Sequence, residues 1–378
     1  MTIDTSMLAM KLKKYRVQFL LTIEELSYST GIPCERLIEF ELGKRLPTGD
    51  EILIISDFYK CDYKFFISNE QLTAFEQTEL LFRRFGESLS KEDRIAIQEV
   101  LYLAECEEFL LQELGITKKE FKFIKQGALF KQHGIEAAKA LRKHLNYQDR
   151  KVPKDVFKDF RSIGIHIFRR HLQNSNISGI YIKHPVVGKC ILVNYNEDVY
   201  RQRFTCAHEV GHSILDDKEE IIVSFNDWDK KDLSEIRANT FASNYLLPPL
   251  FLRKLSETIN WDNQKIIEWS NELKVSTQAL IIALKTEGLI NENQFKSFKS
   301  LKVPKSLKVD PELSGDLSNN EILRKKKFLE LGLSPTYVSI CFEALRRNII
   351  SLDRMCEMLL IGERQLFEIA DLYKEVVI

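Results

Sequence analysis

The chain has 378 residues, of which 44% are hydrophobic and 10% aromatic, and this composition excludes a largely disordered protein. Lysine plus arginine and aspartate plus glutamate number 55 each, so the net charge gives no indication of a nucleic-acid or membrane partner. We predict neither a membrane span nor a signal peptide, and seven dispersed cysteines without a C-x-x-C pair suit a reducing cytoplasm, where we expect the protein.

The chain is expected to hold more than one domain and to be of the α+β class, mainly helical. Apolar residues recur at helical spacing in both end regions, whereas DFRSIGIHIF, NISGIYIK and GKCILVNYN are short β-like runs rich in Ile and Val. We predict five segments, which are an all-α domain at 1–70, a helical connector at 71–150, a core with a small sheet at 151–300, a linker at 301–320 and a helical module at 321–378.

The segment from Leu21 to Ile67 has the spacing of a helix-turn-helix. Leu26 falls in one short helix, Gly31 marks a turn, and Leu37 starts the core of the next helix. The run EFELGKRLPTGDEILIISDFY resembles the lambda-repressor-like (Xre-type) family, whose E-x-G-x-x-x-P turn begins here at Glu41. A helix-turn-helix fold is therefore expected for the N-terminal domain.

The partner of this N-terminal domain stays open. Arg36, Lys44 and Arg45 are the candidate contact residues for DNA or a protein. Residues 1–70 hold nine Lys or Arg against eleven Asp or Glu, and the expected recognition helix PCERLIEFE offers one arginine and three glutamates, which makes a poor reader of a DNA groove. Either the domain binds DNA, or it docks a protein partner or a second copy of the chain as a homodimer.

The stretch FTCAHEVGHSILDD carries the pattern H-E-x-x-H. On a helix, His208 and His212 lie one turn apart on the same face, so that both imidazoles can point at one metal ion. Glu209 lies beside the pair, where a base is needed to take a proton from a water on the metal. Gly211 weakens a helix interior, which indicates that another backbone or a substrate passes close to it.

A catalytic zinc needs a third protein ligand. The long metzincin pattern fails, because Leu215 and Lys218 stand where it requires glycine and histidine. The best candidate is Glu235, at the start of the predicted helix KKDLSEIRANTFASNYLLPP; the alternative is a solvated first-turn carboxylate favoured by the helix dipole. Asn239, one turn later, is expected to bond the outer nitrogen of a ligating histidine.

The runs RFTCAHEVGHSILD and EIRANTFASNYLLP, in this order and at this separation, resemble the ImmA/IrrE family of metallopeptidases over roughly residues 150–290. The resemblance implies a zincin-like zinc endopeptidase with ligands His208, His212 and Glu235 and with Glu209 as the base. It also implies a protein substrate, a helix-turn-helix repressor or another co-encoded regulator. The strand KCILVNYN is either a sheet edge that pairs with substrate or an internal strand.

Two other functions stay open besides the regulatory zinc endopeptidase. One is a DNA-binding regulator, similar to an antitoxin, whose metal domain senses and does not cut. The other is a component of a phage-defence system.

Overall fold

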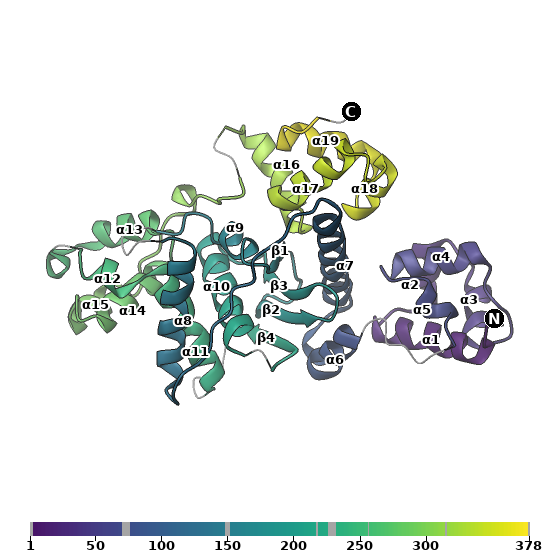
Figure 1. Ribbon diagram of the computed structural model, residues 1–378, viewed down its shortest axis with the longest axis horizontal. Helices are drawn as coiled ribbons and strands as arrows, with labels where there is room; N and C mark the ends of the chain where they lie inside the picture. Colours follow the sequence, from purple (N-terminus) through teal and green to yellow (C-terminus); the bar gives the residue numbers. More distant parts are fainter. Residues whose placement is uncertain are drawn as a thin grey trace. The chain divides into compact units, whose positions relative to one another are not determined.

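The computed structural model describes residues 3–69, 76–147, 152–216, 218–225, 232–255, 257–313 and 316–376. It is mainly helical with one small sheet, as the sequence predicts for an α+β protein (Figure 1). The chain divides into two compact units, one of Met1–Leu103 with Leu172–Asn174 and one of Ala104–His171 with Ser175–Ile378. The division falls inside helix α7 (Lys91–Glu113).

The first unit is helical, as predicted. Before α7 it contains α1 (Thr5–Gln18), α2 (Ile23–Thr30), α3 (Cys34–Glu41), α4 (Gly49–Phe58), α5 (Lys64–Ile67), α6 (Glu76–Phe85) and the 3-10 helix η1 (Gly86–Ser88). Reciprocal bonds between Thr22 and Glu25 start α2, and the same pattern between Thr48 and Glu51 starts α4. Gly31 ends α2 with a φ of 71°, a conformation that favours glycine. The predicted pair of short helices joined at this glycine is confirmed.

The helices of the second unit surround the sheet or extend from it. They are α8 (Phe130–His144), α9 (Val156–Arg161), α10 (Val199–Leu215), α11 (Leu233–Leu246), α12 (Pro249–Leu252), α13 (Asn263–Glu272), α14 (Thr277–Thr286), α15 (Glu292–Phe298), α16 (Asn319–Glu330), α17 (Pro335–Arg346), α18 (Leu352–Met358) and α19 (Glu363–Tyr373), with short 3-10 helices η2 (Thr258–Asn260) and η3 (Lys305–Leu307).

The sheet has the order β1-β3-β2-β4. Its strands are β1 (His166–Arg170), β2 (Ile177–His184), β3 (Gly188–Asn194) and β4 (Ile221–Phe225). Strand β3 pairs with β1 in parallel and with β2 antiparallel, and β2 pairs antiparallel with β4. The strand KCILVNYN is therefore internal, so its interpretation as a sheet edge that receives substrate was wrong. The two edge strands are β1 and β4, and β4 is a five-residue strand that the sequence analysis did not predict.

Helix α10 lies against the sheet and carries the H-E-x-x-H pattern. It contacts β2 and β3 on one side, and α11 and α8 pack next to it on the other (Figure 1). Buried apolar side chains from α8, α9, the sheet, α10, α11 and α14 form one continuous core. The core fixes α10 and α11 against each other, so that residues on their facing surfaces have defined positions.

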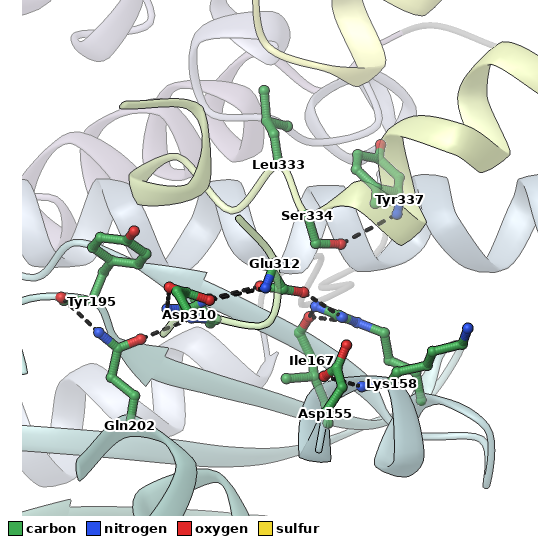
Figure 2. Close-up of polar contacts among 12 residues, drawn as sticks. Asp155, Lys158, Ile167, Tyr195, Gln202, Asp310, Glu312, Leu333, Ser334 and Tyr337 are labelled. Carbon is green, nitrogen blue, oxygen red and sulfur yellow. Dashed lines mark hydrogen bonds and ion pairs between the residues drawn. The ribbon is translucent and has the colours of Figure 1, made fainter. Parts of the chain in front are cut away.

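The segment predicted as a linker belongs to the second unit, where buried ion pairs join it to β1 and α9. The Arg169 guanidinium donates to Asp310 at 2.8 and 2.5 Å and to Glu312 at 2.9 Å, and Arg161 donates to Glu312 at 2.7 Å. Figure 2 shows Asp310 and Glu312 next to each other in this network. The Arg169 Nε also donates to Gln202 of α10 at 2.8 Å, so the network extends to the helix with the metal-binding pattern.

Replacement of Glu312 by glutamine is expected to lower the free energy of unfolding by about 3 kcal/mol, because removing one partner leaves buried charge uncompensated. Urea unfolding followed by tryptophan fluorescence measures it, since Trp261 and Trp269 belong to this unit. The matched control is Glu343→Gln, which breaks exposed pairs with Arg346 and Arg347 and should leave the free energy of unfolding nearly unchanged.

The same variant tests a pH dependence. Burial opposes ionisation of Glu312, but Arg161 and Arg169 lower the pKa of its carboxyl below the usual range. Its contribution to stability is therefore complete above about pH 4.3, the pKa of an unfolded glutamate, and is lost as the pH falls through the lowered folded pKa. Unfolding curves below about pH 4.3 should accordingly fall more steeply for the wild type than for Glu312→Gln; parallel curves would contradict the assignment.

Candidate metal centre

Helix α10 places the two histidines of the pattern inside the protein. The helix begins after Asp198, whose side chain accepts from the Tyr200 N–H, and it continues without interruption to Leu215. His208 and His212 are one turn apart on it, and both are buried. Their rings meet edge to face with centroids 4.7 Å apart, so the two imidazoles share one location.

Helix α11 brings Glu235 to the same location. The Glu235 Oε2 lies 3.3 Å from the His208 Nε2, its Oε1 lies 3.2 Å from the His212 Nε2, and the two Nε2 atoms are 3.0 Å apart. Among the described residues, these three form the group of side chains that could hold a metal ion. The Glu235 side chain is only 13% exposed, which does not fit a solvated first-turn carboxylate.

The outer nitrogen of each ring has its own hydrogen-bond partner. The His208 Nδ1 lies 3.2 Å from the Asn239 Oδ1, and the His212 Nδ1 lies 2.8 Å from the Asp216 Oδ2. Both partner atoms are acceptors, so each Nδ1 is assigned the proton and each Nε2 keeps a lone pair. Two lone pairs and a carboxylate then face one another, an arrangement that a cation stabilises.

Asp216 is a positioning residue that the sequence reading missed. It is not in the group of side chains that converge on one point. Its second oxygen accepts from the Arg237 guanidinium of α11, so it joins the end of α10 to the neighbouring helix. A signal was present, since Asp216 follows His212 at the same four-residue spacing that aligns the two histidines.

Small residues allow the two helices to approach closely. A Cβ atom at Gly211 would lie 3.2 Å from the Cα and 3.3 Å from the carbonyl oxygen of Ala238. The expectation that another backbone passes close to Gly211 is confirmed, and that backbone is α11. This approach brings the first turn of α11, with Glu235, within reach of the histidines.

Glu209 is fully buried and faces strand β2. Neither of its carboxylate oxygens has a hydrogen-bond partner among the described residues. Burial raises the pKa of the Glu209 carboxyl above its usual range, against the opposing influence of His208 and His212. A Cβ atom at Gly179 of β2 would lie 2.8 Å from the Glu209 Oε1, so the glycine leaves the room that this carboxylate occupies.

A small pocket of about 40 Å³ opens beside the three converging residues, large enough for a water molecule. His208, Glu235 and Asn239 form one side of it. Ser224 and Phe225 from the edge strand β4 line another side. The site therefore joins a buried polar centre to the free edge of the sheet.

The other predicted contact residues lie in the first unit. Arg36 forms an ion pair with Glu51 at 2.8 Å, and Arg45 lies 3.6 Å from Glu39. Lys44 is exposed. Two of the three basic side chains that were predicted to contact a partner therefore form ion pairs within their own domain. No helix in the described part of the chain is both long and apolar enough to cross a membrane.

Comparison with known families finds one match. Residues 160–285 match the model of the Peptidase_M78 family, described as the IrrE N-terminal-like domain. The match supports the resemblance of this part of the chain to the ImmA/IrrE family, a metallopeptidase-type function and a metal cofactor. It does not extend to the N-terminal domain. Comparison with curated proteins finds no match to the chain.

Proposed function

We propose that residues 151–300 form a zinc-dependent endopeptidase that hydrolyses a peptide bond in a protein partner. The observation that carries the proposal is the convergence of His208, His212 and Glu235 beside a buried carboxylate, Glu209, without a hydrogen-bond partner among the described residues. The match to a metallopeptidase family supports it.

Zinc suits the donor set. Two imidazole nitrogens and one carboxylate are the protein ligands of many catalytic zinc sites, which keep a further position for water or substrate. Asn239 and Asp216 hold the rings by their outer nitrogens, as metal-ligating histidines generally require. Availability in the cell also decides which metal is bound, and metal analysis of the purified protein measures it directly.

When bound, zinc would supply a Lewis acid and lower the pKa of water towards about 7. Glu209 would accept the proton of the attacking water and later deliver it to the leaving amine. Its place on α10 beside the converging histidines suits this role, because a general base must lie within hydrogen-bond reach of the proton that it accepts. Neither carboxylate oxygen of Glu209 has a hydrogen-bond partner among the described residues, so both oxygens are available to a water molecule.

The substrate that we propose is a helix-turn-helix repressor or another regulator encoded beside this chain, by analogy with the family it resembles. Strand β4 is the last strand of the sheet, and its Ser224 and Phe225 line the same pocket as Glu235. An extended substrate segment would pair with this edge as an additional strand. Main-chain hydrogen bonds would then hold the scissile bond beside the metal centre.

The test is incubation of the purified chain and a purified regulator encoded next to it, with zinc and with an added chelator. Mass spectrometry should detect fragments of the regulator with zinc and none with the chelator. A regulator that stays intact although zinc is bound would contradict the proposal.

Replacement of Asp216 by asparagine is expected to weaken metal binding by about 10- to 100-fold, because the ring of His212 loses its carboxylate partner. Competition with a chromophoric chelator measures the affinity. Asp262→Asn is the matched control, since Asp262 caps α13 and lies outside the metal centre. Equal affinities of the two variants would show that Asp216 does not support the ligand.

The N-terminal domain is proposed to dock the protein substrate and not to read DNA. The ion pairs of Arg36 with Glu51 and of Arg45 with Glu39 reduce the charge available to phosphates. Exposed apolar side chains of this domain, Tyr28 at 93% and Leu42 at 58%, suit a protein surface instead. Specific gel-shift binding that persists in Glu209→Gln, without cleavage of any partner, would favour the DNA-binding regulator.

A further inference from the structure

A large groove of about 1300 Å³ lies next to the metal centre in the second unit. Residues of α8 and α11 line it together with residues of α12 and α14. Helices α8 and α11 run side by side (Figure 1). This groove is far larger than the pocket of about 40 Å³ at the metal centre, so it can receive a segment of another protein.

The wall formed by α8 is basic. Lys131, Lys139 and Lys143 follow one another at multiples of four residues and therefore share one helix face. All three are exposed, and none has an ion-pair partner in the described part of the chain. Among the described residues that line the groove, Glu287 is the one acidic side chain, and it already pairs with Arg253 at 2.7 Å. The groove therefore carries uncompensated positive charge.

Apolar side chains lie between these charges. Ile135 comes from the same face of α8, Leu250 follows the two prolines after α11, and Ile282 comes from α14. Their exposed fractions are 36%, 45% and 46%, which are high for such side chains. A ligand that covers them must itself be partly apolar, and this condition favours a peptide over the phosphate backbone of a nucleic acid.

Asn239 connects the groove to the metal centre. Its side chain lines both the groove and the small pocket, and it also bonds the outer nitrogen of His208. A chain that lies in the groove is consequently adjacent to the residues proposed to perform the hydrolysis. The groove therefore lies where it would bind a part of the protein substrate away from the scissile bond.

We propose that this groove binds an acidic, amphipathic segment of the protein substrate, with the segment's carboxylates against the lysines of α8 and its apolar face on Ile135, Leu250 and Ile282. The identity of the occupant as substrate rests on the proposed function. The recognition chemistry itself rests on the charge and apolar surface of the groove.

The experiment measures binding without cleavage. The full chain with Glu209→Gln is titrated against a fluorescent helical peptide with leucines on one face and glutamates on the other. A second peptide has lysine at every glutamate position, and a labelled DNA duplex is the third probe. Fluorescence anisotropy is recorded at low and at moderate salt, because contacts between exposed charges weaken with ionic strength.

Two charge-reversed variants in the Glu209→Gln background locate the binding. Lys139→Glu/Lys143→Glu changes the groove, and Lys326→Glu/Lys327→Glu makes the same charge change on exposed residues of α16. The acidic peptide should bind at least about tenfold more tightly than the lysine peptide at low salt, and the groove variant should remove this difference while the α16 variant keeps it. Lys139→Gln/Lys143→Gln should lose part of this difference in binding. This variant replaces the charge-reversed groove variant if charge reversal impairs folding.

Equal binding of the acidic peptide to both charge-reversed variants would overturn the proposal. So would a groove variant that loses the DNA duplex and retains the acidic peptide. Binding of the acidic peptide together with an absence of cleavage by the wild-type chain would count against the proposed function alone, because the binding assay needs no hydrolysis.

Discussion

Glu209→Gln is expected to reduce peptide hydrolysis by about 10²- to 10⁴-fold or more while the metal content stays unchanged. Glutamine has nearly the same shape as glutamate, so it should occupy the space next to Gly179 without displacing β2. It cannot accept the proton of the attacking water, and the step that needs a base then has none. Because Glu209 is not in the converging group, the donor atoms for the metal remain.

The measurement combines cleavage of the regulator, followed by mass spectrometry over time, with metal analysis of the same preparation. Glu220→Gln is the control, because Glu220 is exposed and lies outside the pocket. It should cleave at the wild-type rate. A Glu209→Gln protein that keeps both its metal and its rate would mean that another group serves as base.

Local spacing explains how much of the metal centre could be predicted. The four-residue interval places His208 and His212 on one face of any helix, whatever surrounds that helix. Glu235 is harder to predict, because it comes from another helix, but Gly211 indicated that another backbone or a substrate passes close by. In the structure, the backbone that passes close to Gly211 is that of Ala238 in α11. The sequence therefore predicted side chains that converge through helix periodicity and close packing.

Features that depend on distant partners were not predictable in the same way. Arg161 and Glu312 are 151 positions apart, and their ion pair is visible only when the chain is folded. The prolines and polar residues around Glu312 predict a linker, but composition does not tell an anchored segment from a free one. Strand β4 was missed for another reason, since IIVSF is a short β-branched run without a glycine or proline before it.

Glu235→Ala is expected to weaken zinc binding by about 10²- to 10³-fold. Zinc bound by four protein ligands gains about 10–16 kcal/mol, so one ligand corresponds to roughly 3–4 kcal/mol. The remaining pair, His208 and His212, would keep its orientation through Asn239 and Asp216. Zinc stoichiometry after dialysis against a weak chelator should therefore fall from near one to near zero, while the helical circular dichroism stays unchanged.

The decisive comparison is with Glu292→Ala. Glu292 is also a first-turn glutamate, in α15, but it is exposed and pairs with Lys285. If Glu235 acted only through the helix dipole, the two variants would behave alike and both would retain zinc. If Glu235 is a ligand, only its own removal abolishes zinc binding. Zinc content therefore separates these explanations, whereas an unfolding measurement alone would not identify a metal ligand.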